Sequence, residues 1–119
     1  MIAESENELI LLFESYLNSL GIKTETANND RKVMECFLDS KKEEFPYDAI
    51  MLDTHLSNFT GLDVAKRICS EKPDQKIVLV TTTPNEYLPK ECLNTAGIAD
   101  KDIFTMPFKL SNLVKVLTN

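Results

Sequence analysis

The sequence predicts an α/β fold in which helices cover both faces of a doubly wound parallel sheet. Residues 49–52 and 77–80 form two apolar runs without any polar side chain, as in parallel strands that are buried on both faces. Strand-like and helix-like segments also alternate five times along the 119 residues, which favours parallel strands joined by right-handed helical crossovers. We therefore expect a single domain over residues 1–119, built as a three-layer αβα sandwich.

The first part of the chain predicts two strands and two helices. A very short strand at residues 1–3 precedes a helix that ends at Gly21, because glycine commonly closes a helix. Residues 22–27 alternate and are rich in threonine, which favours a second strand with one exposed face. Residues 28–30 supply a turn and a cap for the second helix. The apolar faces of the two helices comprise Leu9, Leu12, Phe13, Tyr16, Leu17 and Leu20, and then Val33, Met34, Phe37 and Leu38.

The rest of the chain predicts three further pairs of strand and helix. A strand that ends on Asp53 leads through a polar loop to an amphipathic helix that begins at Gly61. Residues 76–81 form the next buried strand. A weaker helix follows between Pro89 and Gly97, because proline is tolerated only in the first turn of a helix. A short strand at residues 103–105 then precedes the last helix, whose apolar face comprises Leu110, Leu113, Val114 and Leu117.

Composition excludes several classes of function. Nineteen acidic residues against thirteen basic ones give a net charge of −6, which disfavours direct binding to nucleic acid or to an anionic membrane. The three cysteines lack the spacing of a metal site or a redox motif, so we expect them to be reduced core or helix residues. The chain shows no apolar run of membrane-spanning length and no signal peptide. We expect a cytoplasmic protein.

Polar side chains follow three of the predicted strands at their carboxyl ends. The segment Glu4-Ser5-Glu6, with two acids, follows the first strand, Asp53 ends the third and Thr81 ends the fourth. Ligands of doubly wound sheets bind at this edge, and clustered carboxylates suit a divalent cation such as Mg²⁺. A phosphoryl group could then be held near Asp53, with Asp53 as the nucleophile and Thr81 bonded to a phosphate oxygen. Taken alone, Asp53 is equally well explained as a residue that starts a turn.

The order and spacing of these residues resemble the receiver domain of two-component response regulators over nearly the whole chain. The matching positions are Glu4, Asp53 after an apolar strand, Gly61 eight residues later, Thr81 at the next strand end, and Pro107-Phe108 before the last helix. The resemblance implies a flavodoxin-like sheet of order 2-1-3-4-5.

The resemblance also implies a function for each matching residue. Asp53 would accept a phosphoryl group from a phosphohistidine of a sensor histidine kinase or a phosphotransfer protein. Mg²⁺ would be held by Glu4, Asp53 and the backbone carbonyl of His55. Thr81 would be the switch hydroxyl, and the bond between Met106 and Pro107 would be cis. The output would pass to a protein partner, or to a second copy, through the fourth helix, the fifth strand and the fifth helix.

Three positions depart from the family pattern. Ser5 stands where receivers usually have a second acid that contacts the metal, and either Ser5 itself or Glu6 is a candidate substitute. Ser5 has a purely structural interpretation as well, since with Glu8 it matches a capping box for the first helix. Met106 replaces the lysine that pairs with the aspartyl phosphate, and Ile103 replaces the switch aromatic. The link between phosphorylation and loop movement should therefore be atypical.

Two more residues are candidates for modulating the site. The side chain of His55 in such domains lies over the site and tunes loss of the phosphoryl group, although a solvent-facing loop histidine without a role is the simpler explanation. Thr83 lies two residues beyond the switch hydroxyl. We assign both a modulating role.

Other classes of function compete with this interpretation. A degenerate receiver that serves as a phosphorylation-independent interaction module is favoured by Met106 and Ser5. A haloacid-dehalogenase-like phosphatase needs a second Asp two residues after the nucleophile, where this chain has His55. A flavin carrier needs a phosphate loop after the first strand, and the acids there would repel phosphate. We therefore expect a signalling domain and not an enzyme.

Overall fold

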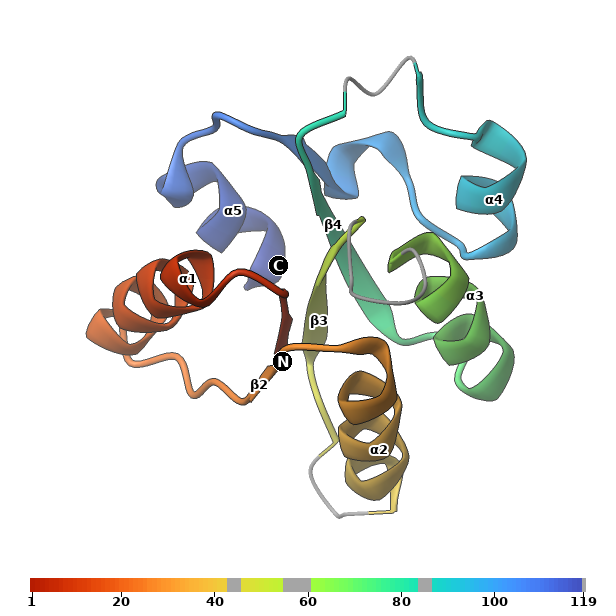
Figure 1. Cartoon of the computed structure of the whole chain (residues 1–119), viewed down its shortest axis with the longest axis horizontal. Coiled ribbons are helices and arrows are strands. Elements are labelled where there is room, and N and C mark those ends of the chain that lie inside the picture. Colours follow the sequence, from red (N-terminus) through yellow and green to blue (C-terminus); the bar gives the residue numbers. More distant parts are fainter. Residues whose placement is uncertain (43–45, 55–60, 84–86, 119) are drawn as a thin grey trace.

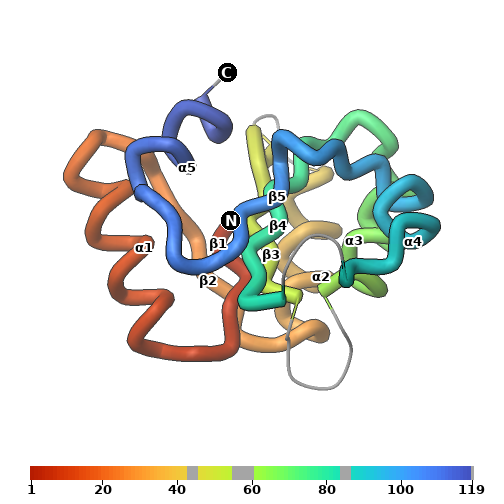
Figure 2. Tube along the Cα trace, turned by 90° about the horizontal axis from the view of Figure 1, so that it is seen from above, coloured from red at the N-terminus to blue at the C-terminus, as the bar shows by residue number. Residues whose placement is uncertain are grey.

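The computed structural model describes residues 1–42, 46–54, 61–83 and 87–118 of the protein. Five parallel strands form one sheet in the order β2-β1-β3-β4-β5. Helices α1 and α5 cover one face of the sheet, and α2, α3 and α4 cover the other (Figures 1 and 2). The doubly wound, flavodoxin-like sandwich predicted from the sequence is thus confirmed.

β3 and β4 are the longest strands of the sheet, and the other three have two or three residues each. β1 spans Ile2–Ala3, β2 Thr26–Ala27, β3 Ala49–Asp53, β4 Lys76–Thr81 and β5 Ile103–Thr105. The helices are α1 (Asn7–Ser19), α2 (Asp30–Lys41), α3 (Gly61–Glu71), α4 (Lys90–Thr95) and α5 (Leu110–Leu117), with a 3-10 helix at Asp100–Asp102. Pro89 is the N-cap of α4, and Gly21 follows α1 with a φ of 80°, as their positions in the sequence predicted.

Two apolar cores lie on opposite sides of the sheet. Successive side chains of a strand point to opposite faces, so Ile50 and Leu52 join the core under α2, α3 and α4, while Met51 joins the core under α1 and α5. The same alternation divides Ile77 and Leu79 from Val78 and Val80 in β4. The uninterrupted apolar runs of the sequence are therefore explained by helices on both faces.

The structure corrects three local predictions. β2 is two residues long and not six, because it lies at the edge of the sheet and pairs with the two-residue β1, at Ile2↔Thr26 and Ala3↔Ala27. Leu12 and Leu20 are 50% and 51% exposed, since α5 covers only part of α1. The capping box is also wrong, because the N-cap of α1 is Glu6, one residue after Ser5.

Candidate functional site

The strand register brings Glu4 and Asp53 together at the carboxyl edge of the sheet. Ala3 pairs with Leu52, so the next residue of each strand lies at the same level. The backbone of Glu4 is held further by a 3.1 Å hydrogen bond from its N–H to Ala27 O. The side chains of Glu4 and Asp53 are hydrogen-bonded to each other. The carboxylate pair expected from the sequence is therefore present.

Glu4 is a buried carboxyl group in an unfavourable electrostatic environment. Its side chain is 2% exposed. Burial, the hydrogen bond to Asp53, and the negative charges of Asp53 and Glu6 together raise the pKa of Glu4 to about 9, against the opposing effect of the Glu6 N–H, which donates to the carboxylate. Within the described part of the chain, Glu4 Oε1 is buried and has no hydrogen-bond partner. A cation would supply the compensation that this oxygen lacks.

Asp53 is positioned by the close approach of α3. Gly61 N donates to Thr54 O at 2.9 Å, and a Cβ atom at position 61 would lie 1.9 Å from Asp53 O. Since real contacts are never that short, only glycine fits there without moving the strand end. The glycine eight residues after Asp53, noted in the sequence as the start of a helix, is thus required by the backbone of the site itself.

Thr81 ends β4 at the same edge of the sheet, one residue after the Val80 that pairs with Asp53, and is 1% exposed. Its hydroxyl oxygen accepts two hydrogen bonds, from Thr54 Oγ1 at 2.9 Å and from the backbone N–H of Thr83 at 2.9 Å. Its carbonyl accepts a 2.8 Å bond from Met106 N. Thr83 therefore contacts the predicted switch hydroxyl through its backbone. Sequence reasoning missed Thr54, although a hydroxyl residue directly after Asp53 was a visible signal.

The candidate metal ligands are only partly described. Glu4 and Asp53 adjoin each other, while Ser5 and Glu6 are both exposed. His55, and with it the predicted carbonyl ligand, lies outside the described residues. No group of three or more His, Cys, Asp or Glu side chains able to hold a metal occurs in the described ranges. Two adjoining carboxylates with one uncompensated buried oxygen nevertheless fit a divalent cation that takes its other ligands from backbone oxygen and water.

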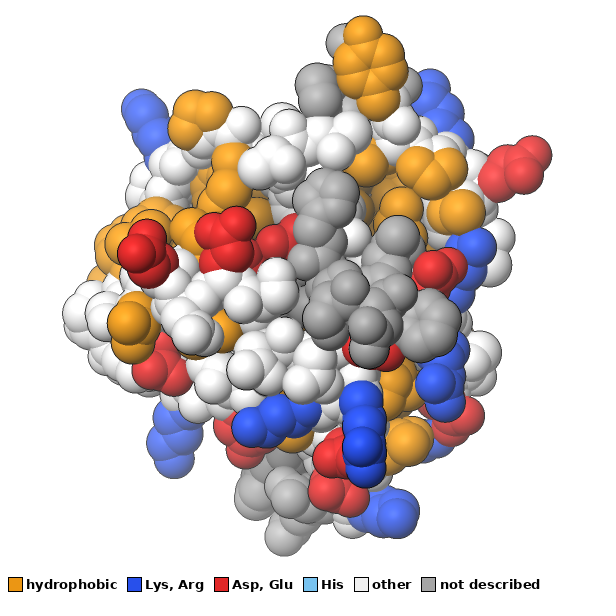
Figure 3. Space-filling view, in the orientation of Figure 1, with side chains coloured by type: hydrophobic (Ala, Val, Ile, Leu, Met, Phe, Trp, Pro, Cys, Tyr) orange, Lys and Arg blue, Asp and Glu red, His pale blue; other side chains and the backbone are white. Residues whose placement is uncertain are grey.

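Met106 contributes packing and a cis peptide bond to this edge. The Met106–Pro107 bond is cis, as the resemblance implied. The Met106 side chain is half-buried and packs against the core under α1 and α5, and Ile103 packs against the opposite core. On the face drawn in Figure 3, acidic side chains lie near the centre beside the start of α1, whereas Lys and Arg side chains lie toward the margins and over α2.

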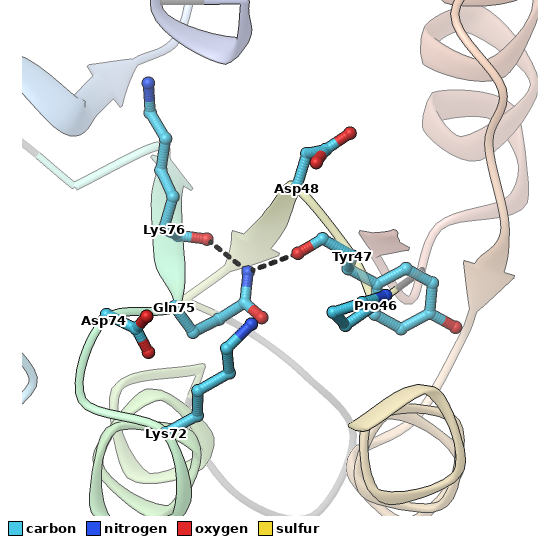
Figure 4. Close-up of a pocket in the computed structure, with 7 residues that line it drawn as sticks. All are labelled: Pro46, Tyr47, Asp48, Lys72, Asp74, Gln75 and Lys76. Carbon is cyan, nitrogen blue, oxygen red and sulfur yellow. Dashed lines mark hydrogen bonds between the residues drawn. The ribbon is translucent and has the colours of Figure 1, made fainter. Parts of the chain in front are cut away.

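A pocket at the opposite, amino edge of the sheet does not contain these residues. It has a volume of about 330 Å³ and is lined by residues 46–48, Lys72 and residues 74–76 (Figure 4). The buried amide of Gln75 donates to Tyr47 O and to Lys76 O, at 3.2 Å each, and so joins the starts of β3 and β4. The polar group that lines this pocket therefore holds two strands together, and we assign the pocket no binding function.

The helices of the described residues do not meet the requirements for spanning a membrane. Over residues 1–42, 46–54, 61–83 and 87–118, no helix has both the length and the apolar character needed to cross a bilayer.

Comparisons with known proteins place the chain in a family. The family model of the response regulator receiver domain matches residues 1–118. The chain is 28% identical over 106 residues to Two-component response regulator 24 of Arabidopsis thaliana, covering 89% of this chain and 71% of that protein. It is 25% identical over 109 residues to the Aerobic respiration control sensor protein ArcB of Escherichia coli, covering 91% of this chain and 13% of ArcB.

A solved structure extends the likeness to the fold. The response regulator TrrA of Thermotoga maritima, crystallised in complex with Mg²⁺ and beryllofluoride, superposes with a TM-score of 0.78 at 25% identity. The alignment covers 98% of this chain and 95% of that one. The bound Mg²⁺ is a property of the TrrA complex, and the similarity of this chain to TrrA is one of fold and sequence.

Proposed function

This chain belongs to the response regulator receiver family, and on that premise we propose that it accepts a phosphoryl group on Asp53 in a Mg²⁺-dependent reaction. The donor is a phosphohistidine of a sensor histidine kinase or a phosphotransfer protein in the cytoplasm. The chain passes the signal on by protein–protein contact. It has no turnover of a separate substrate, so it is not an enzyme in the usual sense.

The transfer exchanges one phosphorus bond for another. A carboxylate oxygen of Asp53 attacks the phosphorus atom, the bond from phosphorus to the imidazole nitrogen breaks, and the imidazole leaves with the electron pair. Thr81 donates a hydrogen bond to an oxygen of the transferred group. Mg²⁺, when bound, neutralises the carboxylates and the phosphate oxygens.

One observation supports this proposal above the others. The Glu4 carboxyl group is buried against Asp53, and its Oε1 atom lacks a hydrogen-bond partner among the described residues. A structural carboxyl group would normally be satisfied by the protein, whereas a group that serves a cation is satisfied only when the cation binds. Glu4 and Asp53 are thus the side chains proposed to hold Mg²⁺, with the His55 carbonyl as the third protein ligand.

A second candidate is a phosphorylation-independent interaction module. It is favoured by Met106, whose half-buried side chain packs against the core and brings no cation to the phosphate. In either case, the surface of α4, β5 and α5 is the proposed contact face for an output protein or a second copy of the chain. We propose no direct contact with nucleic acid or membrane, given the net charge of −6.

Intact-mass spectrometry after treatment with phosphoramidate separates the candidates. With Mg²⁺ present, the proposed function predicts the added mass of one phosphoryl group, and chelation of the metal abolishes it. An unmodified protein under both conditions would favour the interaction module. Continuous release of product from an aryl phosphate would instead reveal a phosphatase and contradict both proposals.

A further inference from the structure

Thr54 and Thr81 form a buried hydroxyl pair at the carboxyl ends of β3 and β4. Thr54 is 5% and Thr81 1% exposed, and their Oγ1 atoms are 2.9 Å apart with Thr54 as the donor. Thr54 directly follows β3, and Thr81 is the last residue of the adjacent β4. The two lie at the same level because Asp53 pairs with Val80 in the sheet. The pair therefore connects Thr54, the neighbour of the proposed acceptor Asp53, to Thr81, the proposed hydrogen-bond donor to the phosphoryl group.

The backbone on both sides of this pair is held firmly. Thr54 N donates to Val80 O at 3.1 Å, and Thr54 O accepts from Gly61 N at 2.9 Å. Thr81 O accepts from Met106 N at 2.8 Å. With both backbone groups of Thr54 bonded and its side chain buried, the Thr54 hydroxyl has little freedom to rotate away from Thr81.

The hydrogen bonds around Thr81 leave one role for its hydroxyl. A threonine hydroxyl has two acceptor lone pairs and one donor proton. Thr54 Oγ1 and Thr83 N occupy both acceptor positions, and within the described residues no acceptor takes the Thr81 proton, so that proton is available to bond an incoming group. A hydroxyl held in this way is a preorganised donor, which is the form that an anionic phosphate oxygen needs.

We propose that Thr54 is a positioning residue that holds the Thr81 hydroxyl as a donor to the phosphoryl group on Asp53. This inference rests on the proposed function. Position 106 carries Met and not the lysine that pairs with the phosphate in other receivers. The hydrogen bond from Thr54 to Thr81 is a direct connection between the end of β3, which carries Asp53, and the switch hydroxyl, and so supplies part of the missing link.

Matched variants test the role of the Thr54 hydroxyl. Thr54→Val replaces the hydroxyl by a methyl group of similar shape, and Thr54→Ser retains it. The affinity for beryllofluoride in saturating Mg²⁺, followed by NMR titration, should fall about three- to tenfold in Thr54→Val, the effect of losing one hydrogen bond. Thr54→Ser should stay within about twofold of the wild type, and the resonance of the Thr83 amide should move in Thr54→Val but not in Thr54→Ser.

A double-mutant cycle separates positioning from packing. In a Thr81→Ala background the hydroxyl that Thr54 orients is gone, so Thr54→Val should then change the affinity less than about twofold. A wild-type affinity in Thr54→Val, or an equal loss in both backgrounds, would overturn the role of Thr54 while leaving the proposed function intact. A wild-type protein that binds no beryllofluoride with Mg²⁺ would instead overturn the proposed function and this inference together.

Discussion

The two edges of the sheet both bury polar groups, but they satisfy them differently. At the amino edge, the Gln75 amide donates to two carbonyls, Tyr47 O and Lys76 O, and the Lys76 ammonium donates to Val116 O. At the carboxyl edge, Glu4 is pressed against another acid and keeps one buried oxygen without a partner in the described chain. A satisfied polar group stabilises a fold, whereas the unsatisfied oxygen of Glu4, buried against a second acid, is the group that the proposed cation would compensate.

The largest effect should come from removing the acceptor at the carboxyl edge. Asp53→Asn keeps the size of the side chain but replaces the attacking carboxylate oxygen by an amide, so labelling by phosphoramidate should disappear completely. Asp48→Asn is the matched control, because Asp48 is an exposed aspartate next to the other end of β3. Intact-mass spectrometry measures both. If the Asp53→Asn variant still gained the mass of a phosphoryl group, the acceptor would be a residue other than Asp53.

A second test compares stability with pH in the absence of metal. The pKa of Glu4 is raised from 4.5 to about 9 in the folded protein, so its contribution to stability is full below about pH 4.5 and is lost as the pH rises toward 9. Glu4→Gln has no proton to lose at this position. Urea unfolding in the presence of a chelator is measured at about pH 5 and about pH 8.5. The free energy of unfolding of Glu4→Gln, relative to that of the wild type, should be higher at the higher pH. Parallel pH dependence of the two proteins would argue against a strained Glu4.

The amino edge should respond in stability alone. Gln75→Met keeps the length of the side chain but removes the amide, leaving two partly buried carbonyls without that donor. The free energy of unfolding should fall by about 1–3 kcal/mol. Because the site lies at the other edge, phosphoryl labelling of Asp53 should be unchanged once the variant is folded. Reduced labelling in a folded Gln75→Met protein would show that the two edges are not independent.

The smallest effect should come from restoring a cation. The long apolar stem of lysine can retain the packing of Met106 while its ammonium reaches the solvent edge of the site. Met106→Lys should lengthen the lifetime of the phosphorylated protein by roughly two- to fivefold, the size of a partly exposed ion pair. Met106→Leu controls for loss of the thioether. Equal lifetimes in the two variants would mean that position 106 does not face the phosphate.

Much of the fold and part of the site were predictable because they depend on local pattern. The bounds of β4 and β5 were right to the residue, and the glycine at position 61 was located by its distance from Asp53. The exposure of Leu12 and Leu20 was not predictable, because periodicity shows which side of a helix is apolar but not how much of it a neighbouring helix covers. The Thr54–Thr81 bond was missed for a related reason, since it joins residues 27 positions apart.

The sequence by itself determined the class of fold and the order of its elements, because burial on two faces demands uninterrupted apolar strands and alternation with helices. It also placed an acid or a hydroxyl at each relevant strand end. Only the tertiary structure decided which of these groups touch. Register set Glu4 against Asp53, and the packing of β3 on β4 set Thr54 against Thr81. Contacts between distant segments depend on that geometry, and a linear pattern does not encode their distances.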